Sequence, residues 1–445
     1  MPTLGGEKEN FNSSVTDPTN ANDSSIIDIG VYTMRNIIDI LAKRGFIQQL
    51  THPDEISRRF AAEKMTCYVG IDPTATSLHV GHLLPLMMMK HLQDAGHFIL
   101  IIVGGGTVMV GDPSGKTEMR SMMMPCEIEE NKRRINEQIS SLLKLGDGKA
   151  EMLDNADWLL ELNLMGFLCE IGSQFSVNRM LTADAYRARM ERPEGGLSFF
   201  ELAYMLLQSY DFLHLNRKYG CNVQIGGDDQ WSNIISGVDL IRRLDHKKAY
   251  GITIPLLTTS DGNKMGKTEK GAVWLDPDRT SPYEFYQFWR NVHDDDVRRF
   301  LLLYTMLPTS EVERLSHAGG SALNEAKKVL AFEITKLIHG ETEARRAADS
   351  AIALFGGGGD GIAMPTTIIS ETDISSGVLV VDALVLCGLC ATRSDARRLI
   401  QQNGLSVNDA KVSDLNMVLL PSDIVDSRIL LRKGKKDFHA LKIGQ

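Results

Sequence analysis

The 445-residue sequence has only six cysteines and no uninterrupted apolar run that approaches eighteen residues. Few cysteines in a long chain do not fit the disulfide framework of a small secreted domain, and we expect no membrane span. The first thirty residues are polar, with Lys8 as their only basic residue, so they resemble neither a signal peptide nor an arginine-rich transit peptide. We interpret residues 1–30 as a disordered tail and expect a cytoplasmic protein.

Cys387 and Cys390 form the only closely spaced cysteine pair, and no second pair or Cys/His couple follows at zinc spacing. The pair could be half of a metal site or a redox pair. We interpret it instead as two small apolar residues in a buried stretch. The sequence therefore predicts no metal site.

A P-loop is also lacking, although two segments come close to one. The Walker pattern requires a glycine, four residues and then Gly-Lys-Ser/Thr. In GGGTVMVGDPSGKT, residues 104–117, the required glycine position holds Val110, and Gly111 leaves only three intervening residues. The segment from Gly262 to Thr268 has the same defect. Two such segments indicate phosphate chemistry by a different arrangement.

Charge is distributed unevenly along the chain. The whole sequence has a net charge of −9, whereas residues 376–445 contain ten Lys and Arg against seven acidic residues. An acidic body with a basic end is a weak indication of nucleic-acid binding.

The order of apolar segments predicts a doubly wound α/β fold. We expect a helix within Tyr32–Leu50, a strand at Cys67–Ile71, a helix from near Gly81 to Leu92, and a buried strand at Phe98–Val103. Strand, helix and strand within about forty residues make one βαβ unit of a parallel sheet. Later strands are expected at Cys221–Ile225 and Ala249–Leu257, and a helical segment at Pro282–Leu354.

The domain boundaries follow from these patterns and from a glycine-rich stretch at 356–361. We expect a Rossmann-like parallel-sheet domain at 31–275, a helical domain at 276–355, a linker at 356–375 and a small α/β domain at 376–445.

Two short motifs carry chemistry. His79-Val80-Gly81-His82 follows the first strand, where a helix N-terminus offers N–H groups to an anion and Gly81 permits close approach. Lys264-Met265-Gly266-Lys267-Thr268 follows a later strand and places two lysines three residues apart. Such lysines can form a cationic clamp for phosphates.

Together the two motifs resemble the paired signatures of class I aminoacyl-tRNA synthetases. Four further segments, 68–74, 111–116, 204–211 and 224–231, closely resemble the bacterial-type tyrosyl-tRNA synthetases, and the similarity runs from Tyr32 to the C-terminus. The resemblance implies that ATP activates L-tyrosine to tyrosyl-adenylate, with Mg²⁺ and no tightly bound cofactor, before transfer to tRNA(Tyr). It also implies a homodimer and an anticodon-side role for the helical domain.

The resemblance implies a role for each matching residue. The implied catalytic residues are Thr74, His79, His82, Lys116, Arg120, Lys264, Lys267 and Thr268. The implied ATP-binding residues are Gly70, Asp72, His79, Gly81, His82, Asp229 and Lys267. The implied tyrosine-binding residues are Tyr68, Asp112, Tyr204, Gln208, Asp211 and Gln230. Because the attacking carboxylate is already ionised, such a site needs positioning and charge neutralisation rather than a general base.

The sequence departs from the family pattern at Val69 and Pro85, where some relatives carry a cysteine and a threonine. Val69 cannot form a hydrogen bond through its side chain, so one expected ribose contact is missing.

The C-terminal segment resembles a small RNA-binding domain shared with a ribosomal protein. The RNA-binding residues expected there are Arg393, Arg397, Arg398, Lys433, Lys435 and Lys436. The three arginines lie near one face of a predicted helix, which suits contact with RNA phosphates.

Two alternatives remain open. A tryptophanyl-tRNA synthetase shares the fold and the reaction, but Tyr68 paired with Asp211 and the C-terminal domain favour tyrosine. A non-catalytic RNA-binding protein could reuse the scaffold, but it would not need His79 or Lys267.

Overall fold

The structure is a computed structural model that describes residues 37–112, 123–191, 196–260, 265–268, 271–317, 321–356, 366–425, 428–434 and 437–444. Among the described residues, no helix is long and apolar enough to cross a membrane. Some of the predictions lie outside the described residues: the tail at 1–30, Lys116, Arg120, Lys264, Lys435 and Lys436.

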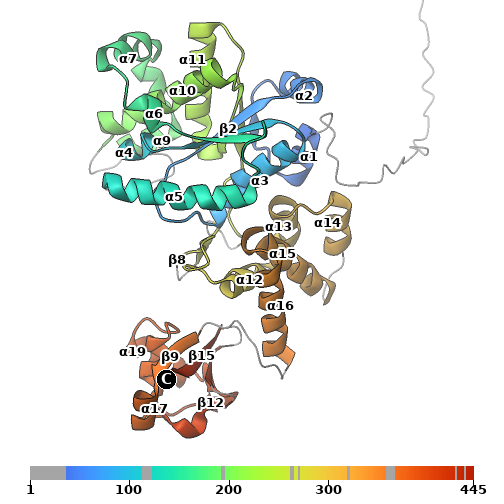
Figure 1. The fold of residues 1–445 in the computed structure, drawn as a ribbon, viewed down its shortest axis with the longest axis vertical. Helices are drawn as coiled ribbons and strands as arrows, with labels where there is room; N and C mark the ends of the chain where they lie inside the picture. Colours follow the sequence, from blue (N-terminus) through green and yellow to red (C-terminus); the bar gives the residue numbers. More distant parts are fainter. Residues whose placement is uncertain are drawn as a thin grey trace, which may run out of the picture. The chain divides into compact units, whose positions relative to one another are not determined.

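Residues 49–254 contain a six-stranded sheet, part of which is labelled β2 in Figure 1. Its strand order is β1-β6-β5-β2-β3-β4. All neighbouring strands are parallel except β1, which is antiparallel to β6. The strands are β1 (Gln49–Leu50), β2 (Thr66–Ile71), β3 (Phe98–Val103), β4 (Ala150–Asp154), β5 (Val223–Gly227) and β6 (Tyr250–Ile254). The predicted α/β fold with a mainly parallel sheet is thereby confirmed.

The helices of this part of the chain are α1 (Ile37–Arg44), α2 (Pro53–Ala62), α3 (Val80–Asp94), α4 (Thr107–Val110), α5 (Pro125–Leu142), α6 (Ala156–Leu159), α7 (Leu164–Glu170), α8 (Val177–Met180), α9 (Asp184–Met190), α10 (Phe199–Tyr219) and α11 (Trp231–Asp245). The helix expected within Tyr32–Leu50 is α1, which occupies only part of that range. The described helix ends at Arg44, because Gly45 has a φ of 87° and Gln49 pairs with Thr253 of β6.

Strand alternation divides the sheet residues between two apolar layers. Val69, Ile99 and Ile101 belong to one core cluster, whereas Tyr68 and Leu100 belong to the other. Successive side chains of a strand point to opposite faces. Tyr68 therefore faces the layer that contains Phe212 of α10 and Leu240 of α11.

The topology creates a switch point between β2 and β5. From β2 the chain proceeds to β3 and β4 on one side, and β5 leads to β6 on the other. In such sheets, ligands bind in the crevice at the carboxyl ends of the strands beside the switch point. The segments that follow β2 and β5 are therefore the expected walls of a site.

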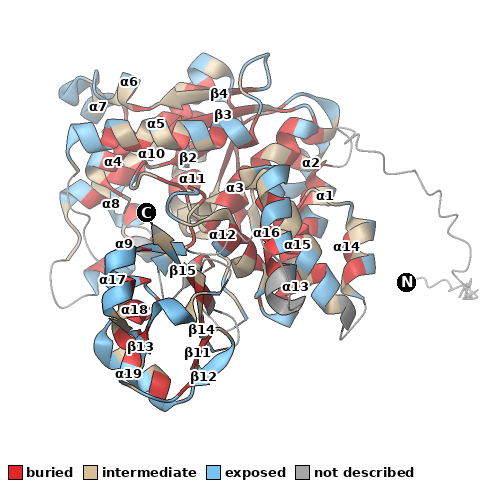
Figure 2. Ribbon diagram, turned by 60° about the horizontal axis from the view of Figure 1, so that its bottom comes forward, coloured by how far each residue is buried: buried red, intermediate tan, exposed pale blue. Residues whose placement is uncertain are grey.

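A helical segment follows the sheet: α12 (Pro282–Arg290), α13 (Val297–Tyr304), α14 (Thr309–Ser316), α15 (Ser321–His339) and α16 (Glu341–Gly356). Its residues share one hydrophobic cluster with one face of the sheet, and that cluster extends from Ile37 to Ala351. The buried Arg44 of α1 reinforces this junction because it donates to the carbonyls of Leu302 (2.8 Å) and Thr305 (3.1 Å) at the end of α13. Figure 2 shows buried faces on α3, α12 and α13.

The C-terminal segment has its own sheet, in the order β12-β11-β14-β15-β9, and its own core. Its elements are β9 (Thr366–Ser370), α17 (Glu371–Ser376), β10 (Val378–Leu379), α18 (Val380–Leu386), α19 (Arg393–Gln401), β11 (Leu405–Val407), β12 (Ala410–Val412), β13 (Val418–Leu419), β14 (Arg428–Lys433) and β15 (Asp437–Gly444). The range expected as a linker, 356–375, thus contains β9, because β9 pairs in parallel with β15. Cys387 and Cys390 are both buried in this core.

Candidate active site

The two histidines that follow β2 form a reciprocal cap at the N-terminus of α3. His79 Nδ1 accepts the N–H of Gly81 (3.0 Å), and His82 Nδ1 accepts the N–H of His79 (3.3 Å). The two rings stack with their centroids 3.9 Å apart. Because Nδ1 of each ring is an acceptor, the ring proton resides on Nε2, which is a donor group suited to an anion.

Gly81 is required by this cap. A Cβ at Gly81 would lie 2.8 Å from Cε1 of His79, so any larger residue would displace the ring. Thr74, which precedes the cap in the same loop, is exposed. The loop itself is anchored to α5, since Asn131 donates to the carbonyl of Pro73 (3.0 Å).

The second motif packs directly against the first. Gly266 has a φ of 81°, and a Cβ there would lie 3.3 Å from Cβ of Val80 and 3.4 Å from the backbone nitrogen of Gly81. Val273 bridges the two motifs, because its N–H donates to Gly266 (2.8 Å) and its carbonyl accepts from Val80 (3.0 Å). The sequence placed the motifs 185 residues apart, and the fold brings them into contact.

Lys267 and Thr268 lie in a short strand. They form β7 (Lys267–Thr268), which pairs antiparallel with β8 (Gly271–Ala272). Met265 is buried, and its N–H donates to the carbonyl of Leu257 (2.9 Å). The described part of this motif is thus held on both sides.

The glycines at the end of β3 accommodate carboxylates of the protein itself. A Cβ at Gly104 would lie 2.2 Å from Oδ1 of Asp72, and one at Gly105 would lie 2.4 Å from Oδ1 of Asp154. This explains why a glycine-rich run exists here without a P-loop: it lets acidic side chains approach the backbone.

Asp72, a predicted ATP-binding residue, is hydrogen-bonded to Tyr204, a predicted tyrosine-binding residue. Its carboxylate accepts the hydroxyls of Thr107 (2.8 Å) and Tyr204 (3.2 Å). A Cβ at Gly70 would meet no atom within 4 Å, so the backbone there borders open space. On the β5 side, Asp229 packs so closely on Gly227 that a Cβ would lie 2.6 Å from its Oδ1.

Asp112 follows Gly111, whose φ is 82°. Its Oδ2 accepts from Nε2 of Gln230 (2.6 Å), and Oε1 of Gln230 accepts from Asn233 (3.0 Å). The segments after β3 and β5 therefore meet at these two predicted tyrosine-binding residues.

Tyr68 and Asp211 lie in the buried layer between β2 and α10. The Tyr68 hydroxyl is buried without a hydrogen-bond partner among the described residues. Burial, followed by the nearby charge of Asp211, raises the pKa of Tyr68 well above its usual value. A buried hydroxyl without a partner has a desolvation cost that a bound polar group could offset.

Two residues that the sequence reasoning missed hold the Asp211 carboxylate. Asn155 donates to Oδ2 (2.9 Å) and Trp158 Nε1 donates to Oδ1 (2.7 Å). Burial raises the pKa of Asp211 to about 7, although these two hydrogen bonds oppose the shift. Asn155 and Trp158 belong to no motif, so only the contact with Asp211 could reveal them.

Two further acceptors lack described partners. Oε1 of Gln208 and Oε1 of Gln224 are buried without one. Gln224 is the Cα partner of Tyr68 in the β5–β2 ladder, which places both side chains on the same face of the sheet. The buried layer beside α10 therefore contains several polar atoms without hydrogen-bond partners among the described residues.

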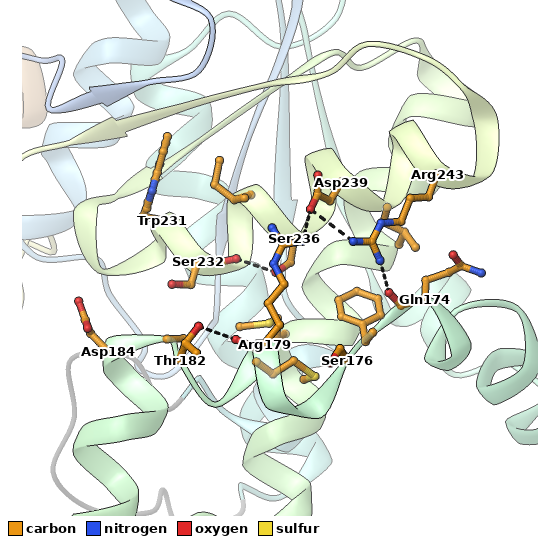
Figure 3. A pocket seen from close by; sticks show the side chains of 16 residues that line it. Gln174, Ser176, Arg179, Thr182, Asp184, Trp231, Ser232, Ser236, Asp239 and Arg243 are labelled. Atoms are coloured by element: carbon orange, nitrogen blue, oxygen red, sulfur yellow. Dashed lines mark hydrogen bonds and ion pairs between the residues drawn. The ribbon is translucent and has the colours of Figure 1, made fainter.

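A separate cavity of about 240 Å³ lies between α8, α9, α10 and α11 (Figure 3). None of the predicted substrate-binding residues lines it. Arg179 pairs with Asp239 (2.8 Å), and Arg243 donates to the carbonyl of Gln174 (2.5 Å), so the guanidinium groups already have partners.

The predicted RNA-binding arginines lie on α19 and are exposed. Arg393 pairs with Asp382 of α18 and Arg398 with Asp395, each at 2.5 Å. Lys433 donates to the carbonyl of Leu389 (2.9 Å), just before α19 begins. RNA phosphates would therefore compete with existing ion pairs at two of the three arginines.

Comparisons with known proteins identify the family of this chain. Residues 61–356 match the family model described as tRNA synthetases class I (W and Y), and residues 362–441 match a tyrosine–tRNA ligase SYY-like C-terminal domain. The tyrosine–tRNA ligase of Clostridium botulinum (strain Hall) is 54% identical over 411 residues, which cover 92% of this chain and all of that protein. The tyrosine–tRNA ligase of Clostridium tetani is 54% identical over 408 residues, covering 92% of this chain and 99% of its own length.

Among solved structures, the C-terminally truncated mitochondrial tyrosyl-tRNA synthetase of Aspergillus nidulans is similar, with a TM-score of 0.65 and 31% identity. The match covers 72% of this chain and 94% of that one. A tryptophanyl-tRNA synthetase from Encephalitozoon cuniculi, with a TM-score of 0.53 and 14% identity over 71% of this chain and 91% of its own, shares the fold.

Proposed function

Because the chain belongs to the class I tRNA synthetases (W and Y) and is a tyrosine–tRNA ligase, we propose that the site at the carboxyl ends of β2 and β5 performs its activation step. ATP and tyrosine are its substrates, and tRNA(Tyr) accepts the tyrosyl group at its 3′-terminal adenosine. The observation that carries this assignment is the packing of Gly266 on Val80 and Gly81, which brings the lysine motif to the histidine motif.

The activation reaction requires positively charged and hydrogen-bond-donating groups at this place. The tyrosine carboxylate attacks the α-phosphorus of ATP, forms the acyl-phosphate bond of the adenylate and expels pyrophosphate. Since this nucleophile is already an anion, the protein must orient it and neutralise the charge that develops on the leaving phosphates. The Nε2–H groups of His79 and His82 are suited to that task, as are Lys267, Thr268 and Thr74.

We propose that Lys116, Arg120 and Lys264 supply further positive charge at the phosphates. These three residues lie outside the described part of the chain, and sequence resemblance supports the assignment. Gly70, Asp72, Gly81 and Asp229 would bind the nucleotide.

The tyrosine subsite is proposed in the buried layer beside α10. Tyr68 and Asp211 would bind the phenol, because one offers a hydroxyl without a described partner and the other a carboxylate held by Asn155 and Trp158. Asp112, Tyr204 and Gln208 would bind the ammonium group, and Gln230 would lie near the carboxylate. The unpartnered Oε1 of Gln208 supports this, since it can accept an ammonium proton.

We propose that Mg²⁺ acts with ATP rather than in a protein cage. Mg²⁺ usually retains waters and is bound through substrate phosphates with few protein ligands. Among the described residues, no group of three or more His, Cys, Asp or Glu side chains could hold a metal ion. Dependence of activation on added Mg²⁺, with no metal in the isolated protein, is the expected result.

A homodimer is proposed from an exposed apolar surface. Six large apolar side chains, just after α6, on α7 and α8 and at the start of α10, are 42–76% exposed: Leu160, Leu164, Met165, Val177, Phe199 and Phe200. Helix α7 has no buried residue at all, and Figure 2 shows it exposed. Surfaces of this kind indicate protein contacts. Light scattering should give twice the chain mass, and Phe199→Glu should give the monomer.

The C-terminal segment 366–444 is proposed to bind tRNA. The exposed guanidinium groups on α19, with Lys433 beside its start, support this role. Lys435 and Lys436, outside the described residues, would extend the basic surface.

The decisive experiment is tyrosine-dependent exchange of pyrophosphate into ATP. We expect exchange with tyrosine and none above background with tryptophan. Stronger exchange with tryptophan, or none with either amino acid, would refute the proposed site. A purely RNA-binding role would also give no exchange.

A further inference from the structure

We propose that Asp296 is a positioning residue for the activation step, fixing the backbone at Ser260, just ahead of the lysine motif, to helix α13. This inference rests on the proposed function of the lysine motif. It concerns a residue of the helical segment that lies in none of the motifs discussed above.

The first observation is an unusual use of a helix cap. Asp296 occupies the N-cap position of α13, where an aspartate normally accepts an N–H from its own helix. Its side chain makes no such cap. Instead, its Oδ2 accepts the N–H of Ser260 (2.9 Å). Asp296 therefore binds the segment between β6 and the lysine motif instead of capping α13.

The carboxylate is buried and both of its oxygens have partners. Asp296 is 3% exposed, and its Oδ1 accepts from Arg299 (2.6 Å). The same guanidinium donates to the carbonyl of Thr258 (2.5 Å). One carboxylate–guanidinium pair therefore holds a carbonyl and an N–H on either side of residue 259. A buried charge without such partners would be costly.

The opposite end of α13 contacts the histidine motif. The buried hydroxyl of Tyr304 donates to the carbonyl of Val80 (3.4 Å), the residue between His79 and Gly81. The C-terminal end of the helix is held in turn by Arg44. A helix of eight residues is about 12 Å long. Since α13 is fixed at both ends, it sets the position of Ser260 relative to Val80.

This geometry has a chemical consequence. The lysine motif must sit correctly relative to His79 and His82 for its charge to reach the leaving phosphates. A misplacement of about 1 Å can reduce a rate by about 100-fold. Tyrosine binds elsewhere, in the layer beside α10, so loss of the Asp296 contact should affect the rate of activation rather than tyrosine binding.

The test uses the full chain with Asp296→Ala, Asp296→Asn and the exposed neighbour Asp295→Asn as a matched control. For Asp296→Ala we expect kcat of pyrophosphate exchange to fall about 10- to 100-fold with the tyrosine KM within about twofold of wild type. Asp296→Asn retains an oxygen that can accept from Ser260, so it should recover most of the lost rate. Asp295→Asn should match wild type.

A second variant covers the case in which Asp296→Ala does not fold. Arg299 is partly exposed, so Arg299→Lys should preserve the fold: it keeps a positive charge for the buried Asp296 but loses the guanidinium that also holds Thr258. We expect a several-fold loss of kcat with an unchanged tyrosine KM. Unchanged kcat in the folded variants, or equal losses in kcat and tyrosine affinity, would overturn the inference. Absence of exchange by the wild-type protein would instead overturn the proposed function.

Discussion

Replacing Tyr68 with phenylalanine should have opposite effects on stability and on tyrosine recognition. The Tyr68 hydroxyl is buried without a described partner, so the free protein bears its desolvation cost, which is about 1–3 kcal/mol for such a group. Removing it leaves no other group unpaired, so we expect the free energy of unfolding to rise by about 1–3 kcal/mol.

The same substitution should weaken the binding of tyrosine. A neutral hydrogen bond to the substrate phenol contributes about 0.5–1.5 kcal/mol, which corresponds to about a two- to twelvefold change in affinity. We therefore expect kcat/KM for tyrosine in pyrophosphate exchange to fall by about that factor. Phenylalanine has no hydroxyl, so its kcat/KM should stay level or rise, and discrimination should weaken accordingly.

A matched control is Tyr186→Phe. Tyr186 is also buried, but its hydroxyl donates to the carbonyl of Leu202 (3.2 Å). Its loss should lower the free energy of unfolding by about 1 kcal/mol without changing discrimination. Denaturant unfolding and exchange assays on both variants decide the matter. If Tyr68→Phe destabilised the protein as Tyr186→Phe does, or impaired both amino acids equally, the reasoning would be refuted.

Three other perturbations test the remaining parts of the site. Burial raises the pKa of Asp211 to about 7. The proton on Asp211 therefore stabilises the folded state fully below about pH 4, and this contribution is lost as the pH rises through 7. If the ionised carboxylate accepts a hydrogen bond from the substrate phenol, as proposed, the kcat/KM ratio of tyrosine to phenylalanine should rise between pH 6 and 8, and a flat ratio would contradict this assignment. Gly266→Ala places a Cβ 3.3 Å from Cβ of Val80 in a residue whose φ is 81°. The resulting strain, roughly 1.4 kcal/mol or more, should displace the lysine motif and lower the kcat of exchange at least tenfold. A variant with the kcat of wild type would show that the two motifs need not touch. Deleting residues after Gly361 should preserve pyrophosphate exchange and abolish tRNA charging, and normal charging by the truncated protein would remove the C-terminal segment from tRNA binding.

Much of the sheet could be predicted from the sequence because its strands have strong local patterns. The apolar run at Phe98–Val103 is the observed β3, and the short strand before His79 is the observed β2 within one residue. Both are buried parallel strands, in which nearly every side chain is apolar. In these two strands, the apolar pattern of the sequence matches the buried position in the fold.

Long-range pairing explains most of what the sequence did not reveal. β9 has few residues and an exposed Ile368, and only its pairing with β15 makes it a strand. Asn155 and Trp158 acquire their role through a contact with Asp211 more than fifty residues away. Asp296 is similar, since its position at a helix start predicts a cap that it does not form. Such roles depend on partners that local sequence does not specify.

The shared hydrophobic cluster has a consequence for synthesis of the protein. Because that cluster extends from Ile37 to Ala351, and α13 packs on α1 and α3 while α15 packs on α5, the faces of α1, α3 and α5 that meet these helices stay uncovered while the ribosome is still producing α12 to α16. A nascent chain that has reached only α11 would expose these helix faces to solvent, as a folding intermediate prone to association. The segment 366–444, with its separate core, can fold afterwards by itself. Completion of the catalytic half therefore depends on residues translated well after its last parallel strand.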